Sequence, residues 1–325
     1  MTVTAVDRDP VALTLTLTAE FDASPARVWE LWADPRQLER WWGPPDWPAT
    51  FSVHDLAPGS HVEYHMSGPA GAREVPAADR SVILRRHEDV AEVVLHRPHK
   101  LNAMNMTWIN DLLEIVSAIA RDKPGLVVIR GEGRAFCAGL DLDMFAAEGM
   151  PPAFYQRQEQ AFAALERLDR LVIAQIHGYC LGGGLQLALA CDIRVMSDDA
   201  LLGLPASAEG VPPGMAPWRL PRYIGLGRTL RLAILGEQID AEEALRIGLA
   251  DHVVPADRFA EHAAALVERY KRVPQAAARA TKELARSSFD TDFTTAYARS
   301  RELVQQCLDT ADAADARAAW LRRHK

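Results

Sequence analysis

Several features that mark specialised classes of protein are missing from this sequence of 325 residues. Lysine and arginine are scattered along a chain of net charge −8, and no basic stripe of the kind that neutralises nucleic-acid phosphates stands out. The four cysteines show no CxxC or Cys/His spacing typical of metal ligands; they are Cys137, Cys180, Cys191 and Cys307. We therefore expect no nucleic-acid partner and no metal site, and we expect reduced, buried thiols rather than disulfides.

A signal peptide and a convincing membrane span are also missing. An acid and an arginine precede the first apolar run, which is unlike a signal peptide. Residues 171–191 carry no formal charge and are long enough to span a bilayer, but they contain four glycines, two glutamines and a histidine. A buried strand followed by a buried helix explains this composition better, so we expect a cytoplasmic protein that does not enter the membrane.

The composition changes near residue 70. Five of the eight tryptophans lie in the first 47 residues, whereas the rest of the chain is rich in alanine and leucine. A Pro/Gly/Ala stretch between these parts is typical of a linker. We predict an N-terminal segment at 1–70, a linker at 71–80, a core at 81–255 and a helical C-terminal region at 256–325.

In the N-terminal segment, the alternation in LTLTLTAEF predicts a strand, and Ser24 followed by Pro25 predicts the start of a helix. TFSVHDL and GSHVEYHMSG predict a hairpin. This order, with the phrase FDASPARVWELWADPRQLERWWGP, resembles the first half of an Aha1/START-like helix-grip domain. Nothing after Pro69 matches its remaining strands and long helix. We expect a partial α+β appendage that needs a partner surface, such as its copy in another subunit. The alternative is that the segment is poorly ordered or is a fusion remnant.

Beyond residue 81, strands alternate with helices. Two strands are predicted within 81–98, an amphipathic helix up to 122, and then strand 126–130, helix 151–168, strand 171–176 and strand 193–198. The alternation predicts right-handed crossovers and a largely parallel sheet that helices cover. From about residue 227 the chain is mostly helical.

Two strand–glycine–helix corners, within 126–145 and 171–192, are the features that point to chemistry. A helix N-terminus leaves N–H groups without partners, and glycine lets another molecule approach the main chain closely. Two such corners can aim two backbone N–H groups at one developing oxyanion.

Four phrases, HRPHKLNAMN, GRAFCAGLDL, HGYCLGGGLQLALACDIRVMSDDALLGLP and GEQIDAEEALRIGLADHVV, resemble the enoyl-CoA hydratase/isomerase (crotonase) superfamily over residues 80–325. The resemblance implies an α/β spiral of ββα turns with a helical C-terminal region, in trimers or dimers of trimers. It also implies acyl-CoA thioester substrates and no metal or redox cofactor, coenzyme A being part of the substrate.

The resemblance also assigns residues. The two N–H donors to the thioester oxygen are those of Leu140 and Gly183. The positions that line coenzyme A and its pantetheine arm are Arg97, Lys100, Leu101, Ala103, Ala138, Asp141 and Leu142. Charge at Arg97 or Lys100 could offset the CoA phosphates, or be an ordinary surface charge. Asp141 is expected to cap the corner helix, and Asp192 and Asp240 to be structural.

The acid/base positions depart from the hydratase pattern. Gln186 and Ala206 stand where family hydratases have glutamates, and neither can exchange protons at neutral pH. Glu209 remains nearby, and burial beside an apolar acyl group would suit it to act as the single base of an isomerase; a surface role is the alternative. A catalytically silent acyl-CoA-binding or assembly protein, and an aromatic acyl-CoA enzyme with Trp218 as an acyl wall, also remain open. Trp218 could equally belong to the core or a trimer interface.

Overall fold

The computed structural model describes residues 2–9, 14–39, 49–54, 62–66, 80–149 and 151–323. The chain divides into two compact units, Met1–Pro76 and Ala77–Lys325. The predicted linker at 71–80, except for Arg80, lies outside the described residues. So do three of the five N-terminal tryptophans, Trp41, Trp42 and Trp47.

The N-terminal unit contains two separate two-stranded antiparallel sheets among its described residues, β1 (Thr2–Asp9) with β2 (Thr14–Glu20) and β3 (Ala49–His54) with β4 (Val62–Met66). Between them lie α1 (Pro25–Ala33) and α2 (Pro35–Leu38). Ser24 caps α1 as predicted, its side chain accepting a hydrogen bond from Arg27 N. Strand β1 was not predicted. No side chain of α1 is buried, so this helix adds little to a core within its own unit.

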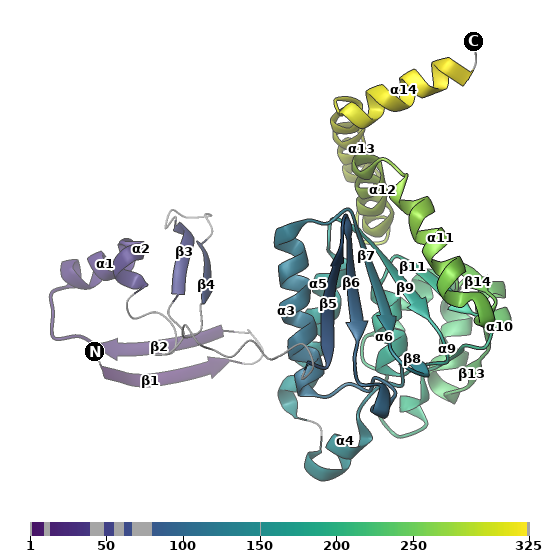
Figure 1. Cartoon of the computed structure of the whole chain (residues 1–325). Helices are drawn as coiled ribbons and strands as arrows, with labels where there is room; N and C mark the ends of the chain where they lie inside the picture. The colour runs from purple at the N-terminus through teal and green to yellow at the C-terminus, as the bar shows by residue number, and fades with distance from the viewer. Residues whose placement is uncertain are drawn as a thin grey trace. The chain divides into compact units, whose positions relative to one another are not determined.

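A six-stranded sheet forms the centre of the second unit (Figure 1). Its strand order is β14-β11-β9-β7-β6-β5, and every neighbouring pair is parallel except β5 with β6. The strands are β5 (Val82–His87), β6 (Val90–Leu95), β7 (Leu126–Gly131), β9 (Leu171–Ile176), β11 (Ile193–Ser197) and β14 (His252–Val254). The predicted, largely parallel sheet is confirmed.

A second, four-stranded sheet has the order β13-β12-β10-β8. Its strands are short: β8 (Ala135–Cys137), β10 (Tyr179–Leu181), β12 (Leu201–Gly203) and β13 (Gln238–Ile239). A strand of the larger sheet, a short strand of the smaller sheet and then helix follow one another three times along the chain. This is the ββα spiral that the resemblance implied.

Helices cover both faces of the larger sheet. On one face lie α3 (Met106–Asp122) and α5 (Pro152–Glu166), whose side chains join the main hydrophobic cluster. On the other lies α11 (Phe259–Lys271), where Ala263 and Val267 pack with Val128 and Ile173 of the sheet. Asn105 starts α3 by accepting a hydrogen bond from Trp108 N at 2.9 Å.

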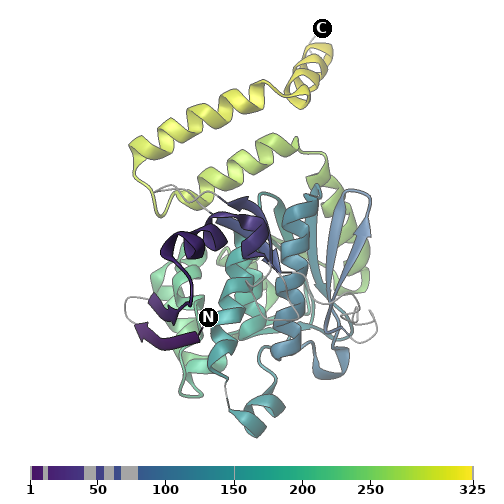
Figure 2. The same cartoon turned by 90° about the vertical axis from the view of Figure 1, so that its left-hand side faces the viewer.

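The remaining helices are α4 (Leu142–Glu148), α6 (Gly183–Ala190), α7 (Ala216–Arg219), α8 (Pro221–Ile224), α9 (Leu226–Leu235), α10 (Ala241–Arg246), α12 (Gln275–Ser287), α13 (Phe293–Leu308) and α14 (Ala311–Arg323). Figures 1 and 2 show α12 and α13 side by side, with α14 continuing away from the sheet. The predicted helical C-terminal region is confirmed.

Candidate active site

The first glycine corner joins β8 to α4. Gly139 has a φ of +98°, and a Cβ at this position would lie 2.9 Å from Leu181 O, so both conformation and space require glycine. Asp141 caps α4 as predicted, its carboxylate accepting a hydrogen bond from Asp143 N at 3.2 Å. The predicted donor Leu140 lies between these two residues.

The chain around Met104 holds this corner in place. Met104 N donates to Gly139 O at 2.7 Å, and Asp141 N donates to Met104 O at 2.9 Å. Met104 therefore bonds to the two residues that flank Leu140 and not to Leu140 itself. The N–H of Leu140 has no acceptor among the residues that the structure describes.

The second corner joins β10 to α6. Gly182 has a φ of +50°, and its N–H donates to Gly203 O at 2.9 Å. Gly183 is the first residue of α6, where an N–H has no acceptor along its own helix. Within the described chain, this N–H also has no acceptor elsewhere.

The two corners touch each other. A Cβ on Gly139 would lie 3.4 Å from Gly183 N, and a Cβ on Gly184 would lie 2.2 Å from Cys137 O. Helix α6 therefore packs directly on β8, and its residues Gly184 to Ala190 are buried. Two unpaired backbone N–H groups thus stand on adjacent corners of one rigid core.

Arg97 pairs with Asp141 beside the first corner. The two side chains are 13% and 8% exposed, and Arg97 Nη2 lies 2.8 Å from Asp141 Oδ2. Burial disfavours the carboxylate, but the hydrogen bond and charge of Arg97 outweigh this effect and hold the pKa of Asp141 below its usual range. Arg97 is thus engaged within the protein, whereas Lys100 forms an exposed ion pair with Asp143.

The other predicted coenzyme A positions differ in exposure. Leu101 takes the left-handed conformation at the end of a short helical turn, Ala103 is buried and Ala138 is half-buried. Leu142, at the start of α4, is 66% exposed. An exposed leucine beside the two corners leaves apolar surface for another molecule to cover.

Gln186 is buried on α6, one turn beyond Gly183. Its Oε1 lies close to the loop before α7, because a Cβ on Gly214 would approach this oxygen to 2.5 Å. Ala206 is half-buried. Its carbonyl oxygen closes a turn by accepting hydrogen bonds from Glu209 N and Val211 N. Glu209 itself is exposed. Of the two readings of Glu209, burial beside the acyl group is therefore wrong for the single chain and the surface position is correct, because this turn carries the side chain outward.

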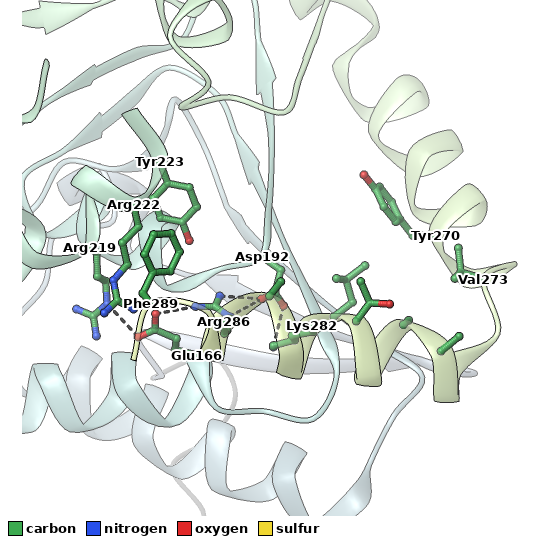
Figure 3. A pocket seen from close by; sticks show the side chains of 15 residues that line it. Glu166, Asp192, Arg219, Arg222, Tyr223, Tyr270, Val273, Lys282, Arg286 and Phe289 are labelled. Atoms are coloured by element: carbon green, nitrogen blue, oxygen red, sulfur yellow. Dashed lines mark hydrogen bonds and ion pairs between the residues drawn. The ribbon is translucent and has the colours of Figure 1, made fainter. Parts of the chain in front are cut away.

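Asp192 and Asp240 are structural, as predicted. Asp240 caps α10 by accepting a hydrogen bond from Glu243 N at 2.8 Å. Asp192 lies beside α12 in Figure 3, where it pairs with Lys282 and Arg286. Together with Glu166 and Arg219 these residues form a charged cluster along α12. The neighbouring cavity, of about 440 Å³, is lined by none of the predicted thioester-site residues.

The cysteines and Trp218 are the remaining residues for which the sequence predicted burial or a role. All four cysteines are free and three are buried; burial raises the pKa of Cys137 and of Cys191 to about 12, so these are inert thiols. Trp218 is 46% exposed, with the Arg222 guanidinium 3.6 Å from its ring centroid. The indole is thus not a core residue of the single chain.

Sequence reasoning missed Gln158, a buried residue of α5. A Cβ on Gly183 would lie 3.4 Å from its Nε2 and 2.9 Å from Met104 Sδ. Helix α5 contains three glutamines, Gln156, Gln158 and Gln160, and nothing in the local sequence marks Gln158 as the one at a site.

The described residues contain no group of three or more His, Cys, Asp or Glu side chains arranged to hold a metal ion. None of the described helices combines the length and the apolar character that crossing a bilayer requires.

Comparisons with known proteins agree with this fold. The family model described as Enoyl-CoA hydratase/isomerase matches residues 85–325, and the model described as Activator of Hsp90 ATPase homolog 1-like protein matches residues 22–77. The chain is 32% identical to the short-chain-enoyl-CoA hydratase of Clostridium acetobutylicum, over 75% of this chain and 96% of the relative. It is 31% identical to the 2,3-dehydroadipyl-CoA hydratase of Escherichia coli, over 74% and 96%.

A solved structure gives the same result. The enoyl-CoA hydratase of Bacillus anthracis superposes with a TM-score of 0.71 at 29% identity, covering 75% of this chain and 97% of that one. The matches extend over the whole spiral and the C-terminal helices, and the N-terminal match agrees with the resemblance found in the sequence. The chain belongs to the enoyl-CoA hydratase/isomerase family.

Proposed function

We propose that this protein acts on acyl-CoA thioesters by stabilising an enolate whose oxygen accepts hydrogen bonds from Leu140 N and Gly183 N. The supporting observation is that these two N–H groups lack acceptors in the described chain and belong to corners that touch. An enolate concentrates charge on the former carbonyl oxygen, and one such donor typically contributes about 3 kcal/mol to the transition state. Backbone donors also tolerate changes of side chain around them.

The coenzyme A part of the substrate would lie along the loop at 97–103 and the first corner. In this proposal Arg97 positions the loop through Asp141, since both are largely buried. Lys100 is the more accessible cation for a CoA phosphate, because its partner Asp143 is 77% exposed and can be exchanged.

We also propose a homotrimer or a dimer of trimers. Large apolar side chains are exposed on α9 and α13 of the single chain: Leu226, Leu230, Ile234, Phe293, Tyr297 and Val304. Large apolar side chains that stay exposed on helices of the single chain are typical of contacts between subunits.

The reaction that we favour is isomerisation or another single-base proton transfer, because Gln186 and Ala206 supply no carboxylates for a two-glutamate hydration. Glu209 is the candidate base and Gln186 a polar orienter. The exposure of Glu209 means that bound substrate or a neighbouring subunit would have to cover it. A silent acyl-CoA-binding protein is the second candidate, and the same two substitutions favour it.

The test is exchange of the α-proton of acyl-CoA thioesters in D₂O, followed by mass spectrometry. Wild type should incorporate deuterium, Glu209→Gln should lose most of this exchange, and Glu261→Gln, on an exposed part of α11, should keep it. Thermal stabilisation by acyl-CoA without exchange would favour the silent candidate. In a complex with acetoacetyl-CoA, a carbonyl oxygen more than about 3.5 Å from both N–H groups would contradict the proposed site.

A further inference from the structure

Gln158 is a buried residue of α5 and is 5% exposed. Its side-chain amide makes no hydrogen bond to any residue that the structure describes. The amide atoms are not among the unpaired side-chain atoms of the described chain that are fully sealed from solvent. They therefore keep a small accessible surface that another molecule can contact.

The amide of Gln158 lies next to Gly183, the second proposed oxyanion donor. Helix α5 packs against α6, and Nε2 of Gln158 is 3.4 Å from the point where a Cβ on Gly183 would be. The sulfur of Met104 stands on the same side at 2.9 Å from that point. The surroundings of Gly183 thus combine one amide with an apolar side chain.

We propose that Gln158 is a specificity-determining residue that hydrogen-bonds a neutral oxygen of the acyl group. The preferred thioesters then carry a hydroxyl or carbonyl group close to the thioester, in place of a plain alkyl chain. This inference rests on the proposed function, because it requires the thioester to bind at Gly183.

The chemistry of the amide sets the class of group. A glutamine side chain can both donate and accept hydrogen bonds, and it carries no charge to pair with a carboxylate or an ammonium group. Covering it with an alkyl chain would leave buried polar atoms unsatisfied, whereas a hydroxyl group would satisfy them. This difference favours the oxygenated thioester by about tenfold in affinity.

The experiment compares three thioesters by titration calorimetry on the full chain: butyryl-CoA, 3-hydroxybutyryl-CoA and 4-hydroxybutyryl-CoA. Mass spectrometry confirms that each stays intact during the titration. Wild type should bind at least one hydroxylated thioester about tenfold more tightly than butyryl-CoA. Gln158→Met should remove this preference while still binding butyryl-CoA, because methionine keeps the length of the side chain but not its hydrogen bonds. Gln160→Met, on the exposed face of the same helix, should keep the preference.

Equal binding of all three thioesters by wild type would overturn this inference alone, as would a preference that survives Gln158→Met. Failure of every thioester to bind would overturn the proposed function and this inference with it. A structure of wild type with the preferred hydroxylated thioester gives a second measurement that does not depend on the variant folding. A hydroxyl group more than about 3.5 Å from both amide atoms of Gln158 would also overturn the assignment.

Discussion

The charged cluster along α12, which contains Asp192, Lys282 and Arg286, gives the most direct test of how this fold is held together. Asp192 Oδ2 accepts a hydrogen bond from Val172 N at 2.8 Å and lies 2.8 Å from Lys282 Nζ, and its Oδ1 lies 2.7 Å from Arg286 Nη2 (Figure 3). The side chains of Asp192 and Lys282 are 9% and 7% exposed. The Asp192 carboxylate therefore joins α12 to the N-terminal ends of β9 and β11.

Asp192→Asn keeps the size of this side chain and removes its charge. Breaking a buried ion pair from one side costs about 3–5 kcal/mol, because the other charge stays buried without a counter-charge. In a unit as large as Ala77–Lys325, this corresponds to a fall in melting temperature of about 6–20 °C. Scanning calorimetry or thermal unfolding followed by circular dichroism measures the fall on the full chain.

The same variant should acquire a distinctive pH dependence. Burial lowers the pKa of Lys282, and Asp192 opposes this effect, so removing the carboxylate lowers the pKa further. The unfolded chain then binds more protons at this lysine than the folded chain does, and stability rises as the pH rises toward the unfolded value of about 10.4. The deficit of Asp192→Asn relative to wild type should therefore shrink as the pH rises above neutral toward that unfolded value.

Asp290→Asn is the matched control, because Asp290 pairs with Arg222 at 3.0 Å but is 59% exposed. Such a pair contributes less than about 1 kcal/mol. If Asp192→Asn melted within the range of this control at neutral pH, the cluster would not anchor α12 and the reasoning would be wrong.

Two further predictions concern the glycine corners. Gly184→Ala should prevent stable folding or cost several kcal/mol of stability, because its Cβ would lie 2.2 Å from Cys137 O. Gly227→Ala is the control: a Cβ there meets open space in α9, so the variant should be neutral or gain up to about 1 kcal/mol. Denaturant titration of soluble protein compares the two variants. Against the opposing effect of burial, Arg97 lowers the pKa of Asp141, so this pair stabilises the fold above the unfolded value near pH 4 and is lost as the pH falls through the lower folded value. Asp141→Asn should therefore lose less stability than wild type on acidification below about pH 4, and an equal loss would contradict this account.

Local sequence signals predicted the parts of the fold in which neighbouring residues determine structure. The strand predicted at 171–176 coincides with β9, and Ser24, Asp141 and Asp240 cap helices because a side-chain oxygen needs only the next turn of backbone as its donor. The largely parallel sheet followed from the alternation of strands and helices alone.

Elements that depend on distant partners were harder to predict. Strands β8, β10 and β12 have three residues each, too few for a period of two to show, and they exist because they pair with one another. The exposure of Glu209 depends on a turn closed by Ala206 O, and the sequence alone does not say to which side that turn carries its side chain.

The three glycines of the second corner show where this limit lies. In the sequence they form one break between a strand and a helix, but a different structural feature requires glycine at each position. Gly182 has a positive φ, Gly183 faces Met104 and Gln158, and Gly184 packs on Cys137 O. The last three neighbours come from three separate parts of the chain, so no window around the glycines contains them. The corner is therefore predictable from sequence because it is local, whereas the side chains that surround its glycines become visible only once the spiral has brought α5 and β8 against α6.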